Sequence, residues 1–315
     1  MTPRRATAAA AAALVAAVAG CGFGAGERDE GVATITVTRD FGAEEMTVID
    51  VEDPAESDTV MRVLDRSVEL RTRYGGGFVQ AIDGVAGGRT GGRTHDWFYY
   101  VDGIEASVGA AEWPLRAGQR VWWDHRDWTT AMRVPAVVGS FPEPFLQAAA
   151  EPEERLEVRV ECAGTDAACD AAAEALADAG VEAERAELGS PGGEEALRVV
   201  VGEWDAVRGD DVAALLERDP AESGVFARFE GEGGEWELVA LDERAEPAAS
   251  VPADAGLVAA LRAGEEPPTW VVTGASAEAV EAAAGALDEE ALRNRYAVAV
   301  ADGAPVPLPV GEGAP

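Results

Sequence analysis

The sequence lacks lysine altogether. The 315-residue chain has 25 basic residues, and every one of them is an arginine. This absence excludes enzymes that work through a Schiff-base lysine and phosphate-binding loops that end in lysine. The 59 acidic residues bring the formal net charge to −34. Because affinity for nucleic acid comes largely from neutralised phosphates, we expect no nucleic-acid partner for so acidic a chain.

Histidine is scarce, with two copies in the chain. His95 precedes Asp96, and His125 follows Asp124, so these pairs form either an acid/base or metal site or a surface salt-bridge network. Neighbouring strand residues point to opposite faces, and no nucleophile motif accompanies the pairs. We therefore expect no enzyme, no catalytic residue and no metal site.

The N-terminus resembles the export signal of a bacterial lipoprotein. A basic pair, Arg4 and Arg5, precedes an apolar stretch that ends in residues 18–21 (VAGC), which is similar to a lipobox. The resemblance implies that residues 1–20 are removed and that Cys21 is lipidated. The protein would then be exported and anchored by lipid to the outer face of the cell membrane. The alternative is an alanine-rich helix with an incidental cysteine.

Two cysteines remain beside Cys21. Cys162 and Cys169 flank a short turn, and an even pair in an exported protein is typical of a disulfide. The alternatives are two free thiols or a metal or redox site, although the spacing is not that of a Cys-x-x-Cys motif.

Composition divides the chain after the signal. Residues 21–31 are glycine-rich and are expected to be a flexible tether. Residues 21–147 hold 21 acidic residues and 12 arginines, whereas residues 148–315 hold 38 and 11. Prolines at 135, 142, 144 and 152 mark an extended crossover between the two parts. We predict one domain over 32–146, a linker over 147–154 and an acidic domain over 155–310.

The first domain is expected to be a β-grasp, in which one helix packs across a mixed sheet. Alternating and β-branched segments predict strands, and an N-cap at Ser57 and Asp58 begins a helix. The predicted strands cover 33–39, 46–51, 78–82, 97–101 and 120–126. The loop 84–92 (GVAGGRTGG) is expected to be mobile and could cover an aromatic face as a lid.

A family resemblance rests on several motifs in order. They are residues 59–64 (TVMRVL), 77–84 (GFVQAIDG), 97–103 (WFYYVDG), 115–122 (LRAGQRVW) and 134–139 (VPAVVG). They resemble the bacterial domains grouped with the C-terminal β-domain of transcobalamin and intrinsic factor, over about 110 residues.

That resemblance implies a ligand-binding β-grasp module with cobalamin as one ligand. In the animal carriers this domain closes over the corrinoid opposite a helical barrel, which this chain lacks. A helical-barrel protein or a vitamin-uptake transporter is the partner that the resemblance implies.

Aromatic residues concentrate in the first domain. Five of the eight tryptophans lie between residues 97 and 128. Strand alternation places neighbouring rings on opposite faces, and a single helix buries only one face. The other face must meet a ligand, a protein partner or another part of the chain. The candidate ligand-binding residues are Trp97, Phe98, Tyr99, Tyr100, Trp122, Trp123 and Trp128.

The second domain is expected to be α+β and ferredoxin-like. Predicted strands alternate with helices at 166–179 and 205–217, followed by a hairpin at 225–241. Residues 199–202 (VVVG) are echoed by 271–274 (VVTG), each leading into a helix and then a hairpin. The domain is therefore either one unit or a duplicated pair of units. No motif in it carries chemistry.

Two functions follow from these features. The first is a non-enzymatic binding lipoprotein that captures cobalamin or another small ligand for uptake. The alternative is a structural lipoprotein that docks a transporter or a helical partner. An exported hydrolase is a third and weaker hypothesis, because no catalytic set is visible.

Overall fold

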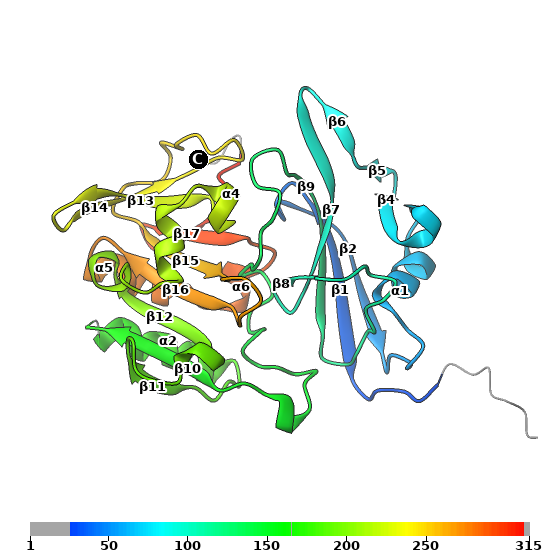
Figure 1. Ribbon diagram of the computed structural model, residues 1–315, viewed down its shortest axis with the longest axis horizontal. Coiled ribbons are helices and arrows are strands. Elements are labelled where there is room, and N and C mark those ends of the chain that lie inside the picture. The colour runs from blue at the N-terminus through cyan, green and yellow to red at the C-terminus, as the bar shows by residue number, and fades with distance from the viewer. Residues whose placement is uncertain (1–25, 165, 312–315) are drawn as a thin grey trace, which may run out of the picture.

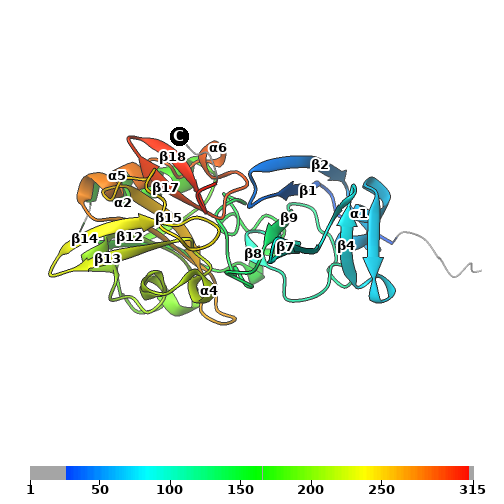
Figure 2. The same ribbon diagram turned by 90° about the horizontal axis from the view of Figure 1, so that it is seen from above.

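The computed structural model describes residues 26–164 and 166–311. They form a mixed α+β structure in which two sheet-based halves lie side by side along the longest axis of the molecule (Figures 1 and 2). The predicted lipidation site Cys21, the predicted signal 1–20 and most of the predicted tether lie outside the described residues. None of the described helices is long and apolar enough to cross a membrane.

The N-terminal half is built on a six-stranded mixed sheet with the order β2-β1-β9-β7-β6, with β8 paired to the end of β7. Strand β1 pairs antiparallel with β2 and parallel with β9, so that Thr34 lies opposite Arg120 and Arg39 opposite His125. The strands are β1 (Val32–Arg39), β2 (Glu44–Glu52), β6 (Gly88–Thr90), β7 (Arg93–Val101), β8 (Ile104–Glu105) and β9 (Arg120–Asp127).

One helix and a small second sheet cover one face of this sheet. Helix α1 (Val60–Ser67) buries Val60, Val63 and Leu64 against β1, because these residues recur at helical spacing. Its N-cap is Thr59, whose hydroxyl accepts a hydrogen bond from the Arg62 amide at 3.3 Å, and not the predicted Ser57 or Asp58. The small sheet consists of β3 (Leu70–Arg73), β4 (Phe78–Ile82) and β5 (Val85–Ala86).

The C-terminal half is a seven-stranded sheet with the order β11-β10-β12-β16-β15-β17-β18. The pairs β10–β11, β10–β12 and β12–β16 are parallel, and the remaining pairs are antiparallel. The strands are β10 (Val158–Ala163), β11 (Glu184–Glu187), β12 (Leu197–Glu203), β15 (Gly256–Leu261), β16 (Thr269–Gly274), β17 (Ala297–Ala301) and β18 (Ala304–Leu308).

Different elements cover the two faces of this sheet. Helices α2 (Asp166–Asp178) and α5 (Ala277–Ala284) pack on one face. The separate hairpin of β13 (Ala227–Glu232) and β14 (Glu235–Ala240) packs on the other. The short helices α3 (Trp204–Val207), α4 (Pro220–Ser223) and α6 (Glu289–Leu292) complete the half, and 3₁₀ turns lie at Tyr74–Gly76, Pro152–Glu154, Gly193–Glu195 and Ala213–Glu217.

This topology corrects the predicted equivalence of two hairpins. The segments 199–202 and 271–274 lie in β12 and β16, which are parallel neighbours. The hairpin that follows the first forms its own two-stranded sheet, whereas β17–β18 extends the large sheet. The predicted helix over 205–217 is also wrong. It is two short pieces that break at residues 208–212, where the Asp210 carboxylate accepts from the amides of Val212 and Ala213.

Much of the crossover between the halves is buried. Val134 and Val137 belong to the core that includes β13 and β14, whereas Val138, Phe141 and Phe145 belong to the core under α2 and α5. Each of these five side chains is at most 4% exposed. The segment therefore packs as a part of both cores and not as a surface strap.

Candidate functional site

The paired strands β7 and β9 present two aromatic faces. Their antiparallel register places Tyr99 opposite Trp123 and Tyr100 opposite Trp122. We call the face toward α1 and β4 the hollow face; it carries Trp97, Tyr99, Trp123 and His125. We call the face toward the C-terminal half the covered face; it carries Phe98, Tyr100, Trp122, Asp124 and Arg126.

Tyr296, next to β17, packs against the covered face. Its ring centroid lies 5.8 Å from that of Tyr100, 5.1 Å from that of Trp122 and 5.2 Å from that of Phe41. Tyr100 is fully buried and Trp122 is 2% exposed. The sequence predicts both as ligand contacts. In the structure their rings pack in the contact between the two halves.

A buried carboxylate ties the same contact together. Asp124 is fully buried, and it accepts hydrogen bonds from the Thr38 hydroxyl at 2.6 Å, the Gly42 amide at 3.1 Å and the Tyr296 hydroxyl at 2.9 Å. Burial raises the pKa of Asp124 above its ordinary value, and it raises the pKa of Tyr296 well above 10. The Trp122 indole donates to the Thr38 hydroxyl at 2.7 Å, which completes the network.

Arg126 fastens the crossover to the covered face. Its guanidinium lies 3.9 Å from the Phe98 ring centroid and donates to the carbonyls of Ala131 at 2.7 Å and Met132 at 3.0 Å. Arg126 is fully buried. A buried charge needs such partners, so Phe98 is held as a platform for this arginine.

The hollow face keeps an open cavity. Tyr99 stacks on Trp123 with ring centroids 4.7 Å apart, and the Trp97 indole donates to the Val85 carbonyl at 3.1 Å. Between these rings and β4 lies a cavity of about 150 Å³, lined also by Met61, Phe78, Gly109 and Ala110. Glu105 is the one carboxylate in its lining. Its lining combines these aromatic rings with polar atoms, so the rings offer a contact surface to an aromatic or apolar group.

Two further aromatic residues stand at the tip between β3 and β4, beside this cavity. Tyr74 is 87% exposed and Phe78 is 38% exposed, and their rings meet edge to face at 6.3 Å. Gly75 and Gly76 have φ angles of 73° and 98°, which allow the tight tip that holds the two rings outward. Neither residue is among the ligand contacts predicted from the sequence. The available signal is two aromatic residues that flank a triple glycine.

Trp128 and the histidines lie away from the cavity lining. The Trp128 amide donates to the Thr94 carbonyl at 2.9 Å, just beyond β9. His95 stacks on His125 at 5.8 Å, and its Nε2 lies 3.6 Å from Asp127, which also pairs with Arg93. Burial lowers the pKa of His125. The described residues contain no group of three or more metal-ligating side chains.

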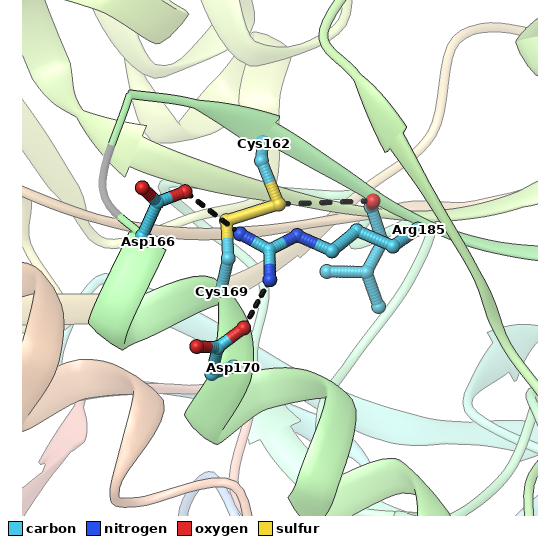
Figure 3. Close-up of a disulfide and its surroundings, with 6 residues drawn as sticks. Cys162, Asp166, Cys169, Asp170 and Arg185 are labelled. Atoms are coloured by element: carbon cyan, nitrogen blue, oxygen red, sulfur yellow. Dashed lines mark hydrogen bonds and ion pairs between the residues drawn. A yellow bond between two sulfur atoms is a disulfide. The ribbon is translucent and has the colours of Figure 1, made fainter.

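The predicted disulfide is present. Cys162 on β10 and Cys169 on α2 are bonded, with their Cα atoms 6.0 Å apart (Figure 3). On the surface beside it, Arg185 donates to Asp166 at 2.9 Å and pairs with Asp170. The disulfide therefore joins the start of the α2 helix to the sheet.

Comparison with known proteins places a family match on the aromatic strands. Residues 57–126 match the family described as Domain of unknown function (DUF4430). The match runs from the N-cap region of α1 to β9 and includes the cavity and its rim.

No curated protein matches the chain. A solved structure from Ruminococcus gnavus, a "putative metal binding protein", aligns with 18% identity and a TM-score of 0.26, over 31% of this chain and 98% of that one.

Proposed function

We propose that the protein is an exported, lipid-anchored binding protein without enzymatic activity, which holds a small apolar ligand at the hollow face. The observation that carries this proposal is the cavity bounded by Trp97, Tyr99 and Trp123, with Phe78 and Tyr74 exposed at its rim. Concave sites lined by aromatic rings with few polar groups are typical of ligand pockets. The aromatic rings in the lining supply surfaces on which a ligand can stack, and binding requires no catalytic group beside them.

We infer that the N-terminal half is a β-grasp domain of the transcobalamin type. The β1–β2 hairpin, the helix α1 and the return strand β9 parallel to β1 support this arrangement. The family match over residues 57–126 covers most of the motifs on which the resemblance rests. The C-terminal half would then be a ferredoxin-like variant enlarged by additional strands.

A corrinoid is one candidate ligand. It is far larger than a cavity of about 150 Å³, so it would lie across the rim and stack on Phe78 and Tyr74 while an edge group entered the hollow. A helical-barrel partner or an uptake transporter would cover its other side.

Export and anchoring have separate support. Residues 18–21 are similar to a lipobox, and the Cys162–Cys169 disulfide suits an oxidising compartment outside the cytoplasm. The chain would be held at the outer face of the cell membrane through Cys21. Expression of wild type and Cys21→Ser with labelled palmitate tests this. Label and membrane association should both be lost in the variant, and equal labelling of the two proteins would refute lipidation at Cys21.

The ligand proposal is tested by fluorescence titration. Tryptophan emission is followed with cobalamin, and N-phenyl-1-naphthylamine serves as a neutral apolar probe. Phe78→Ser should weaken binding about tenfold or more, since aromatic anchors dominate such sites. Met132→Ser is the matched control, because Met132 is 59% exposed but lies on the crossover.

The two probes separate the outcomes. Saturable binding of the naphthylamine without cobalamin quenching would remove the corrinoid and keep a smaller apolar ligand. The absence of saturable binding by both probes would refute the ligand-binding function.

The alternative function, docking of a protein partner, is favoured by one observation. Tyr74 is 87% exposed and does not line the cavity, so its ring is open to a larger partner than a ligand inside the cavity. A photo-crosslinking amino acid at position 74 distinguishes the two functions in cells. A protein adduct with position 74 and none with position 132 would support docking.

A further inference from the structure

A second cavity lies where the two halves meet. It has a volume of about 330 Å³, and its apolar walls are Ile104, Pro144, Leu156, Leu197, Pro267 and Pro268. These residues come from β8, the crossover, the segment just before β10, β12 and the turn before β16. Ligand sites are common at such junctions between domains. This junction cavity shares no lining residue with the cavity at the hollow face.

Hydrogen bonds build its walls. The Gln147 amide group donates to the Leu156 carbonyl at 2.9 Å and accepts from the Leu156 amide at 2.7 Å. The Val137 amide donates to the Gly103 carbonyl at 2.9 Å, which ties the β7–β8 turn to the crossover. Leu156 is 40% exposed although its backbone is fastened in this way. Hydrogen bonds therefore fix the segments that line the cavity, and the Leu156 side chain at its rim is partly exposed.

Charge in the lining is mainly negative. Asp102, Glu143 and Glu265 face one cation, Arg262. The Arg262 guanidinium donates to the Glu265 carbonyl at 2.9 Å through Nη2 and to the Glu266 carbonyl at 2.7 Å through Nε, which holds it at the turn before β16. The nearby Arg120 donates through Nη1 to the Phe141 carbonyl and to Glu289, and its charge also acts on Asp102.

The buried Glu143 and the partly buried Asp102 differ in what their carboxylates can still accept. The Glu143 carboxylate accepts from the amides of Gln147 at 2.8 Å and Ala148 at 2.9 Å, one on each oxygen. Asp102 accepts from the Arg120 amide at 2.8 Å through Oδ1, and its Oδ2 has no partner among the described residues. Burial, with the Glu143 charge beside it, raises the pKa of Asp102 to about 7. A cation at Oδ2 would form an ion pair with this partly buried carboxylate.

We propose that this junction cavity binds a small organic ammonium ion, whose charged nitrogen meets Asp102 and whose apolar body rests against Leu156, Leu197 and Ile104. An anion would face three carboxylates, and a neutral ligand would leave Asp102 without a partner. The site is independent of the proposed function, since it shares no residue with the aromatic hollow.

The probe is benzylamine, with benzyl alcohol as its uncharged counterpart, and binding is measured by calorimetry at about pH 8. Benzylamine should bind the full chain saturably, and Asp102→Asn should weaken it about tenfold or more, because a charged hydrogen bond is lost. The matched control is Asp83→Asn. Asp83 also has a positive φ, precedes a glycine in a strand turn and accepts a backbone amide at 2.8 Å, but it is exposed.

A second variant guards against misfolding of the first. Leu156→Ser removes an exposed apolar side chain and should weaken benzylamine binding several-fold, whereas Phe78→Ser at the hollow should leave it unchanged. Equal binding by wild type and Asp102→Asn, equal affinity for benzyl alcohol, or no saturable binding to wild type would each overturn the proposal.

Discussion

The hollow face and the covered face belong to the same two strands and are similarly rich in aromatic residues, yet they differ in what lies on them. On the covered face, Tyr296 and the crossover fill the space against Tyr100 and Trp122. On the hollow face, α1 and β4 stop short and leave a cavity beside Tyr99. Aromatic content alone therefore does not distinguish the buried face from the open one, and the difference comes from the neighbouring elements.

The largest expected effect is on the covered face. Trp122→Ala should lower the free energy of unfolding by about 3–5 kcal/mol, because it removes a buried ring and the donor to Thr38. Urea denaturation measures the change. The folded variant should bind naphthylamine as wild type does. A loss below about 1 kcal/mol, or a selective loss of binding, would reverse the roles assigned to the two faces.

A pair of Tyr→Phe variants sharpens the comparison. Tyr296→Phe keeps the ring contacts but removes a donor to the fully buried Asp124, and it should cost about 1–3 kcal/mol. Tyr99→Phe removes a bond to the partly exposed Val108 carbonyl and should cost about 0.5–1 kcal/mol. Equal costs by denaturation would show that the covered face is no more tightly coupled than the hollow face.

Asp102, in the turn between β7 and β8, predicts how the stability of the protein depends on pH. Folding raises the pKa of Asp102 from 3.8 to about 7 through burial, so between these values the folded state binds a proton that the unfolded state has released. The Asp102 contribution to stability therefore falls as pH rises from about 4 to 7. Asp102→Asn should flatten this part of the profile, whereas Asp83→Asn should leave it unchanged. Parallel profiles for wild type and Asp102→Asn would contradict the assignment.

The smallest effect on stability is expected at the rim of the hollow. Phe78→Ala should change the free energy of unfolding by no more than about 1 kcal/mol, because the ring is 38% exposed. Its effect on ligand binding should be much larger than its effect on stability. A large loss of stability in denaturation experiments would mean that Phe78 is a core residue instead of a binding one.

Period-two alternation was enough to separate the two aromatic faces, and the disulfide followed from cysteine number and spacing. The choice of the open face could not be predicted. It depends on Tyr296, which lies 174 residues beyond Trp122 in the chain and shows no local pattern. Strand β15 was also missed. All six of its residues are buried, so they give no alternation by which a strand is recognised.

The junction cavity was missed for a related reason. Asp102 and Gly103 predict a tight turn, and that turn is present between β7 and β8. Its proposed second role depends on Leu156, Leu197 and Arg262 of the C-terminal half, which only the packing of the two halves brings close to Asp102. A sequence pattern describes neighbours along an element and cannot identify such distant partners.

The crossover has a consequence for protein engineering and for evolution. Since Val134 and Val137 serve one core while Phe141 and Phe145 serve another, no cut within residues 131–146 yields two intact modules. A fragment ending at residue 130 would expose Tyr100 and Trp122, and one starting at 147 would expose Trp270, which packs on Phe145 at 5.0 Å. We therefore expect the two halves to unfold as one cooperative unit. Recombination of the N-terminal half with another partner would require a new surface for Tyr100 and Trp122.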